Sequence, residues 1–139
     1  MTFPRIDTLI AAPLAGQTLS PDGATWAIAE WTDEGGGFSP PRTIAPLHVH
    51  HEDDEAWYVL EGTLTFLLDG TEVTASAGGA VLVPRGVAHT WWNPSPEPAC
   101  YLIVMTTRIN ELIGQIHAHA ASREDLKALF RRYQSELLD

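Results

Sequence analysis

Short segments rich in Val, Ile, Thr, Trp and Tyr, separated by turn residues, occupy the chain from Gln17 to Met105. Ten prolines and eleven glycines punctuate a sequence of 139 residues, which favours many short strands joined by tight turns. Asp69-Gly70, for example, is typical of the centre of a two-residue hairpin. The pattern predicts an all-β sandwich or barrel. We expect strands over residues 25–31, 44–50, 55–60, 63–68, 72–75, 80–84, 88–93 and 99–106.

After Thr107 the spacing of apolar residues changes from a period of two to the period of a helix. One helix face would carry Ile109, Leu112, Ile113, Ile116 and Ala120, and a second would carry Leu126, Leu129, Phe130, Tyr133 and Leu137. Ser122 can cap the second helix. Two such helices are too small to form a domain, so their apolar faces should cover the sheets or a partner chain. We therefore predict one domain over residues 1–139, with a barrel at about 17–106 and a helical appendage at about 107–138.

Composition and charge narrow the range of partners. With 45% hydrophobic residues the chain can build a core, and its net charge is −10. Lys and Arg are scattered, so nucleic acid and anionic membrane surfaces are poor partners. No apolar stretch approaches the length of a membrane span. The single cysteine, Cys100, cannot form an intramolecular disulfide, and we expect it to be a buried strand residue in a soluble, cytoplasmic protein.

Four side chains have the types and spacing of metal ligands. His48 and His50 point to the same face of a strand, because successive side chains alternate. Glu55 opens the next strand and would return beside them if the two strands pair antiparallel. His89 follows a Pro and Gly turn at the start of a later strand. Three imidazoles and one carboxylate suit a divalent transition metal, namely Fe, Mn, Ni, Cu or Zn. The competing interpretation is that all four are surface residues.

Side chains of matching parity identify a possible pocket. Trp57 and Val59 share the face of Glu55, and Trp91 shares the face of His89. We expect these three residues to line a substrate pocket, although plain core packing explains the two tryptophans equally well. The remaining histidines and the acidic loop residues are predicted to lie on the surface: His51, Glu52, Asp53, Asp54, His117 and His119. Of these, only His51 competes as a ligand, and it is one residue out of register with His50.

The same residues resemble the two sequence motifs of the cupin family. The matching positions are His48, His50, Glu55 and Gly62 in the first motif, and Gly78, Pro84, Gly86, His89 and Asn93 in the second. Arg42 departs from the pattern, because it stands where the family has its opening glycine. The sequence around the motifs is similar to sequences of the quercetin-dioxygenase-like group of small cupins. This resemblance implies a double-stranded β-helix, or jelly-roll barrel, that holds one metal with His48, His50, Glu55 and His89. It does not imply a substrate.

The leading functional hypothesis is a metal-dependent dioxygenase-like enzyme that acts on a small aromatic or enol-bearing molecule. Glu55 is the candidate catalytic base, because no other carboxylate is placed for that role. A non-redox isomerase or decarboxylase is the first alternative, although Arg42 and Arg85 are the only basic residues near the motifs. A non-catalytic metal-binding or ligand-binding module is the second. Apolar helix faces and outward aromatic residues also predict a homodimer.

Overall fold

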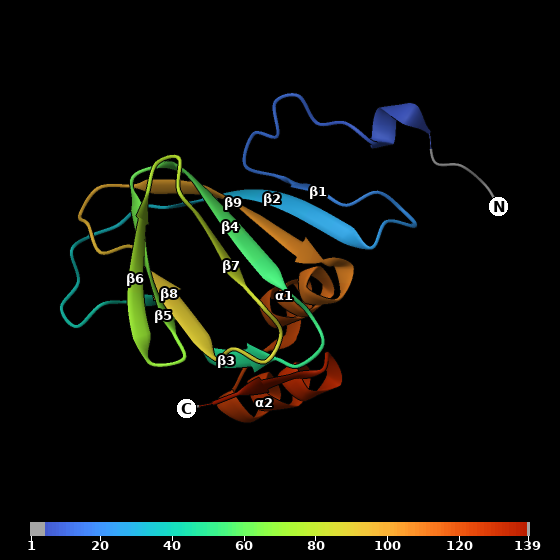
Figure 1. Ribbon diagram of the computed structural model, residues 1–139. Helices are drawn as coiled ribbons and strands as arrows, with labels where there is room; N and C mark the ends of the chain where they lie inside the picture. Colours follow the sequence, from blue (N-terminus) through green and yellow to red (C-terminus); the bar gives the residue numbers. More distant parts are fainter. Residues whose placement is uncertain (1–4, 139) are drawn as a thin grey trace.

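The structure is a computed structural model and describes residues 5–138 (Figure 1). Its strands are β1 (Thr18–Leu19), β2 (Trp26–Asp33), β3 (Thr43–His50), β4 (Glu55–Glu61), β5 (Thr63–Leu68), β6 (Thr71–Ser76), β7 (Ala80–Val83), β8 (His89–Trp92), β9 (Ala99–Thr106) and β10 (Ser135–Leu137). Its helices are the 3-10 turn η1 (Ile6–Thr8) and the α-helices α1 (Thr107–His119) and α2 (Arg123–Arg132). Strands β2 to β9 correspond to the eight predicted strands.

The strands form two antiparallel five-stranded sheets, with the orders β1-β2-β9-β4-β7 and β10-β3-β8-β5-β6. The chain passes from one sheet to the other at every connection between β2 and β10 except the one that joins β5 to β6. The two sheets face each other as the walls of a double-stranded β-helix, which confirms the predicted all-β fold class. Side chains on the facing surfaces therefore meet inside the barrel.

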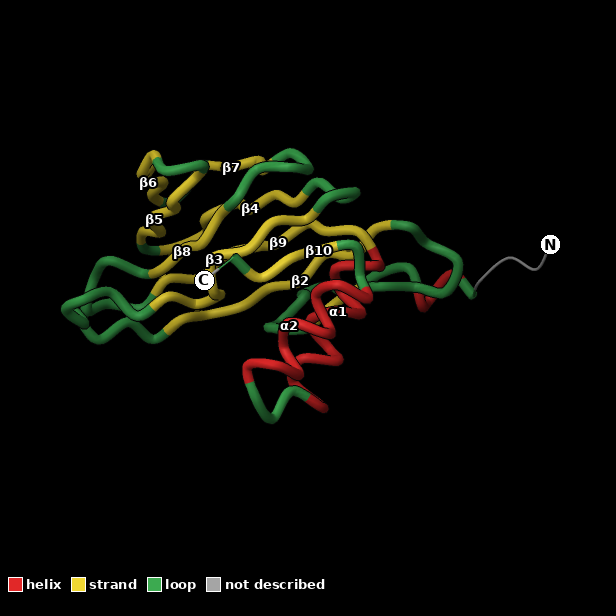
Figure 2. The backbone as a smooth tube through the Cα atoms, turned by 90° about the horizontal axis from the view of Figure 1, so that it is seen from below, coloured by secondary structure: helices red, strands yellow, loops and turns green. Residues whose placement is uncertain are grey.

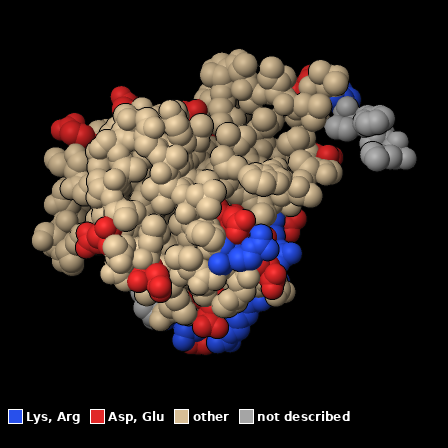
Figure 3. Space-filling model, in the orientation of Figure 1, with Lys and Arg blue, Asp and Glu red and all other residues tan. Residues whose placement is uncertain are grey.

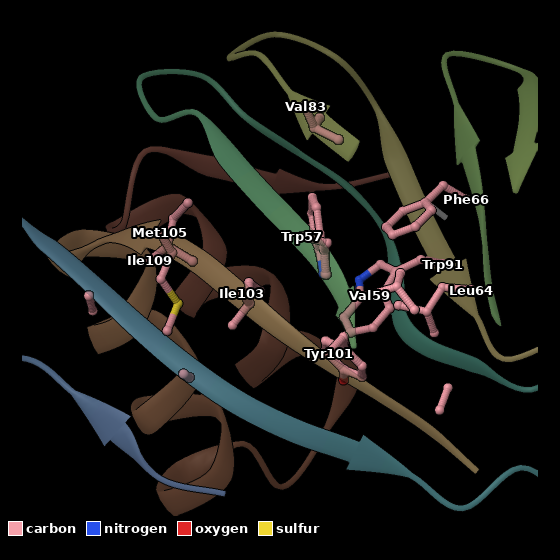
Figure 4. Packing of buried hydrophobic residues seen from close by; sticks show 13 residues of the cluster. Trp57, Val59, Leu64, Phe66, Val83, Trp91, Tyr101, Ile103, Met105 and Ile109 are labelled. Atoms are coloured by element: carbon pink, nitrogen blue, oxygen red, sulfur yellow. The ribbon is translucent and has the colours of Figure 1, made fainter. Parts of the chain in front are cut away.

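Aromatic side chains fill part of the barrel interior (Figure 4). The ring centroid of Trp57 lies 5.1 Å from that of Phe66 and 5.5 Å from that of Trp91. The ring of Trp91 in turn meets Tyr101 edge-on at 5.1 Å. Edge-to-face pairs of this kind add about 0.5–1.5 kcal/mol each beyond the burial of their area. These packed rings form the core of the barrel.

The two α-helices pack at one end of the sheets (Figure 2). The side chain of Thr106 accepts a hydrogen bond from the backbone N–H of Ile109 at the start of α1. Ser122 accepts one from Asp125 at the start of α2, as its position in the sequence predicted. A second hydrophobic cluster, separate from the barrel core, joins the helices through Leu112, Leu129, Phe130 and Leu137. Neither α-helix among the described residues is long and apolar enough to cross a membrane.

The prediction of a helix up to residue 138 was wrong at its C-terminal end. Helix α2 stops at Arg132, and Gln134 adopts a positive φ of 59°. The chain then turns into β10, which pairs with the edge of β3. Leu137 lies four positions after Tyr133, as in a helix, but it also alternates with the buried Ser135, as in a strand. Pairing with β3 satisfies backbone groups that a sheet edge would leave open, so the strand forms.

Candidate metal site

Four buried side chains meet inside the barrel, and they are the four that the sequence singles out. His48 and His50 come from the end of β3, Glu55 from the first position of β4, and His89 from the first position of β8. One ligand atom from each residue lies within 4.8 Å of the others. All four side chains are at most 5% exposed. The cluster is therefore small and dry enough to hold a single metal ion.

The two sheets bring these residues together from opposite sides. His48 lies directly across from His89 in the pairing of β3 with β8. Glu55 belongs to the other sheet, where β4 pairs with β7 and β9. Strands β3 and β4 therefore do not pair with each other, although Glu55 still returns beside the two histidines. The carboxylate reaches the imidazoles across the interior of the barrel, because the inner faces of the two sheets point at each other.

Hydrogen bonds fix the orientation of each imidazole. The Nδ1–H of His48 donates to the carbonyl oxygen of Pro46 at 2.6 Å, and that of His89 donates to Val87 at 2.9 Å. The Nδ1 atom of His50 lies 2.6 Å from the hydroxyl of Ser135. Because a carbonyl oxygen only accepts, the proton of His48 and of His89 must sit on Nδ1. Their Nε2 lone pairs are then free to bind a metal.

The distances inside the cluster call for a cation. Nε2 of His89 lies 3.2 Å from Oε1 of Glu55, and Nε2 of His50 lies 3.4 Å from the same oxygen. Two electron-rich atoms at such distances in a buried site require a proton or a metal ion between them. Three imidazole nitrogens and one carboxylate oxygen form a donor set that first-row transition metals accept. The residues present thus fit the metal that the sequence predicts.

Burial also controls the protonation of the cluster. Burial, together with the neighbouring His89 and His50, lowers the pKa of His48 to about 3, so its ring stays neutral. Burial alone would raise the pKa of Glu55, but the neighbouring His50 and His89 outweigh it and lower the pKa to about 2. The site therefore holds at least one neutral imidazole beside an ionised carboxylate, which is the protonation state that a cation needs.

A cavity of about 360 Å³ opens onto the cluster. Its walls are mostly apolar and come from the barrel and from both helices: Trp31, Ile44, Ala45, Pro46, Trp91, Ile109, Leu112, Ile113, Ile116 and Phe130. His48, His50 and Glu55 lie on the cavity wall, and His117 is its one further polar lining residue among those described. The helices thus form one wall of the cavity.

Of the three predicted pocket residues, only Trp91 lines this cavity. Trp57 and Val59 are 1% and 0% exposed and belong to the barrel core, so their assignment to the pocket was wrong. Strand parity correctly turns them inward, but it does not say how far along the barrel they lie. The aromatic packing around Trp57 fills that part of the interior.

Of the polar residues that were predicted to lie on the surface, Asp53 differs from the prediction. Asp53 was expected in solvent, but it is 7% exposed, with Oδ2 3.6 Å from Nε of Arg108 at the start of α1. The carboxylate of Asp54 accepts hydrogen bonds from the backbone N–H, Nε and Nη2 of Arg85. The side-chain bonds hold the pKa of Asp54 below its usual value. His117 is exposed as predicted, yet it lies at the cavity.

The two remaining histidines and the cysteine lie outside the cluster. His51 and His119 are exposed and lie outside the cluster, as expected. Cys100, predicted to be buried, is only half-buried on β9, with its sulfur 3.8 Å from a carboxylate oxygen of Glu30.

Comparisons with known proteins identify the type of domain. Residues 38–105 match the Cupin_2 family of cupin domains. A cupin-2 domain protein from Shewanella frigidimarina superposes with a TM-score of 0.50 at 23% identity, covering 63% of this chain and 76% of its own. A sugar phosphate isomerase of the cupin superfamily from Silicibacter pomeroyi gives 0.52 at 27% identity, covering 60% and 51%. Residues 38–105 are therefore a cupin domain of the Cupin_2 type, and the two solved structures share its fold.

A curated protein also matches part of the chain. Oxidoreductase iacF of Pestalotiopsis fici is 35% identical over 80 residues, which make up 57% of this chain and 38% of that protein. The chain thus spans well under half the length of this relative and about half the length of the S. pomeroyi isomerase.

Removal of a ligand should abolish metal binding. We expect purified wild-type protein to bind close to one transition metal ion per chain, and His48→Ala and His89→Ala each to lose it, because three donors remain and a buried position is emptied. Elemental analysis after dialysis measures the stoichiometry. His51→Ala is the matched control, since His51 is exposed and adjacent to a proposed ligand. Full metal retention in both ligand variants would show that the cluster does not hold the ion.

Acid should destabilise the metal-free protein. Since the pKa of His48 falls from 6.5 to about 3 on folding, only the unfolded chain gains this proton between those values. The contribution to stability is complete above pH 6.5 and declines by at most about 1.4 kcal/mol per pH unit as the pH falls toward 3. Glu55 adds a loss of the same sign below pH 4.5. Urea unfolding in the presence of a chelator measures the slope, which should be shallower in His48→Gln. Equal slopes in the two proteins would contradict the assignment.

Proposed function

We propose that the protein is a metal-dependent, dioxygenase-like oxidoreductase that acts on a small aromatic or enol-bearing molecule. The observation that carries the proposal is the apolar cavity of about 360 Å³ that ends at the four-residue cluster. His48, His50, Glu55 and His89 would hold the metal. When bound, an ion of Fe, Mn, Ni or Cu supplies Lewis acidity and redox capacity, and four protein ligands leave positions for substrate and dioxygen.

The cavity walls favour an aromatic ligand over a charged one. Trp31, Trp91 and Phe130 supply ring surface, and no Lys or Arg is found among the described residues that line the cavity. The two basic residues near the motifs are engaged elsewhere, since Arg42 pairs with Asp33 and Arg85 pairs with Asp54. On the face shown in Figure 3, most Lys and Arg side chains gather over the helices and the loops beside them. A phosphate group would lack a partner in this cavity.

Glu55 is the proposed catalytic base. It is the one carboxylate among the described residues that line the cavity. Its side chain is 5% exposed and ionised, so it can accept a proton from an enol or phenol hydroxyl group that enters the cluster. Removal of that proton leaves the substrate as an anion, which is the form that a metal ion binds through oxygen. Bulk water is largely excluded because the residue is buried.

The relatives support two candidate functions. The P. fici protein is named an oxidoreductase, which agrees with the leading proposal. The S. pomeroyi protein is described as a sugar phosphate isomerase, which makes a non-redox isomerase or decarboxylase the second candidate. The absence of a cationic lining residue in the described part of the chain argues against a sugar phosphate. A non-catalytic ligand-binding module is the third candidate, and the oxygen assay below separates it from the other two.

Oxygen consumption tests the enzymatic proposal. We expect protein loaded with Fe, Mn, Ni or Cu to consume dioxygen with a catechol, a flavonol or an enediol, and zinc-loaded protein to consume none. Ile113→Trp should keep the metal and slow the reaction by at least about tenfold, because the larger side chain fills the cavity. An oxygen electrode and product analysis by mass spectrometry measure both effects. Isomerisation without oxygen uptake would instead establish the second candidate, and binding without turnover the third.

We also propose that the protein forms a homodimer through the outer face of the sheet that contains β2, β4 and β7. Trp26 and Leu82 are each 65% exposed there, and Tyr58 is 43% exposed. Exposed apolar side chains of this size on one face of a sheet are typical of a surface covered by another chain. Trp26→Glu should therefore shift the protein from dimer to monomer in sedimentation at micromolar concentration, whereas Val73→Glu, on the other sheet, should not. Wild-type protein that sediments as a monomer would rule out the dimer.

A further inference from the structure

We propose that Ser135, on the C-terminal strand β10, positions His50 for metal binding and so makes this strand part of the metal centre. The proposal rests on the metal site inferred above and assigns a role to a residue outside both cupin motifs. It concerns the support of a ligand and leaves open which reaction follows.

The register of β10 places Ser135 directly beside the ligand. In the antiparallel pairing of β10 with β3, Ser135 lies opposite His50 and Leu137 lies opposite His48. Directly opposed residues point to the same face of a sheet, with their Cβ atoms about 4.5–5.5 Å apart. Both β10 residues are therefore inward, and both are buried, whereas Glu136 between them is exposed. Two flanking backbone bonds, from His51 to Gln134 and from Leu138 to Leu47, hold this register.

The hydroxyl of Ser135 determines which nitrogen of His50 carries the proton. Its Oγ lies 2.6 Å from Nδ1 of His50 and 3.2 Å from the carbonyl oxygen of Tyr133. The carbonyl accepts the one hydroxyl proton, so Oγ must accept from the Nδ1–H of His50. The Nε2 lone pair then faces Oε1 of Glu55, 3.4 Å away. The chain from Tyr133 through Ser135 thus fixes both the tautomer and the ring orientation.

His50 differs from the other two imidazoles in where its hydrogen-bond partner lies in the sequence. His48 and His89 donate to carbonyl oxygens only two residues away, so the local backbone orients them. The partner of His50 lies 85 positions further along the chain. Ser135 and His50 are 3% and 4% exposed, so water cannot readily replace the hydroxyl. The C-terminal segment also contacts His48, because the ring of Phe130 meets it edge-on at 5.3 Å.

Loss of the hydroxyl should weaken metal binding. We expect Ser135→Ala to raise the Kd of the full-length metal-free chain for Zn²⁺ by about 10–100-fold, the usual effect of removing a partner of a ligating histidine. Ser135→Thr keeps the hydroxyl and should stay within about threefold of wild type. Glu136→Ala is the matched control, since it lies on the same strand but faces outward. Competition with a chromophoric chelator measures each Kd.

A spectroscopic readout separates positioning from stability. Visible absorption of Co²⁺-loaded protein should change in Ser135→Ala and stay unchanged in Glu136→Ala, because only the first alters the orientation of His50. Nitrogen NMR of the zinc-loaded wild-type chain tests the tautomer without any variant, and we expect the His50 proton on Nδ1. Wild-type affinity and an unaltered cobalt spectrum in Ser135→Ala, or a His50 proton on Nε2, would overturn the role of Ser135. Wild-type protein that binds neither metal would overturn the metal centre itself, and this inference with it.

Discussion

The fold depends on placing four electron-rich side chains in a dry interior. Such a cluster is unfavourable unless each polar atom has a partner and a cation neutralises the carboxylate. The architecture meets the first condition, because each imidazole Nδ1 has its own partner. The Nε2 atoms of His50 and His89 converge with Glu55, where a bound cation would meet the second. Bonds between loops hold the two motifs in place. Arg85 donates hydrogen bonds to the carboxylate of Asp54, next to Glu55. The N–H of Gly86 donates to the carbonyl oxygen of His50 at 2.8 Å.

The barrel is divided between packing and binding. Aromatic side chains around Trp57 pack together in part of the interior. Gly62 allows the turn before β5 to pass close to the segment before β9. Its φ is +79°, and a Cβ atom there would lie 2.5 Å from the carbonyl oxygen of Pro98, so only glycine fits. The cavity lies where α1 and α2 cover the cluster. Part of the wall against which a substrate would bind therefore comes from helices outside the Cupin_2 match.

The local parts of this structure follow from the sequence, and the long-range parts do not. Alternation along β3 correctly places His48 and His50 on one face, and turn chemistry delimits the strands. Spacing cannot show that Glu55 approaches from the opposite sheet, because either arrangement turns its side chain inward. Nor does it show how far along the barrel Trp57 lies. The sequence does not reveal the role of Ser135, because its partner, His50, lies 85 positions earlier in the chain. The apolar spacing around Ser135 also fits a helix.

The C-terminal segment links the two parts of the proposed site. Phe130 of α2 lines the cavity and touches the ring of His48, while Ser135 of β10 bonds His50. Leu129, Phe130 and Leu137 hold this segment against α1 through a cluster separate from the barrel core, so it packs as a unit. The same segment therefore serves both parts of the proposed site: α2 contributes to the cavity wall, and β10 pairs with the strand that carries His48 and His50.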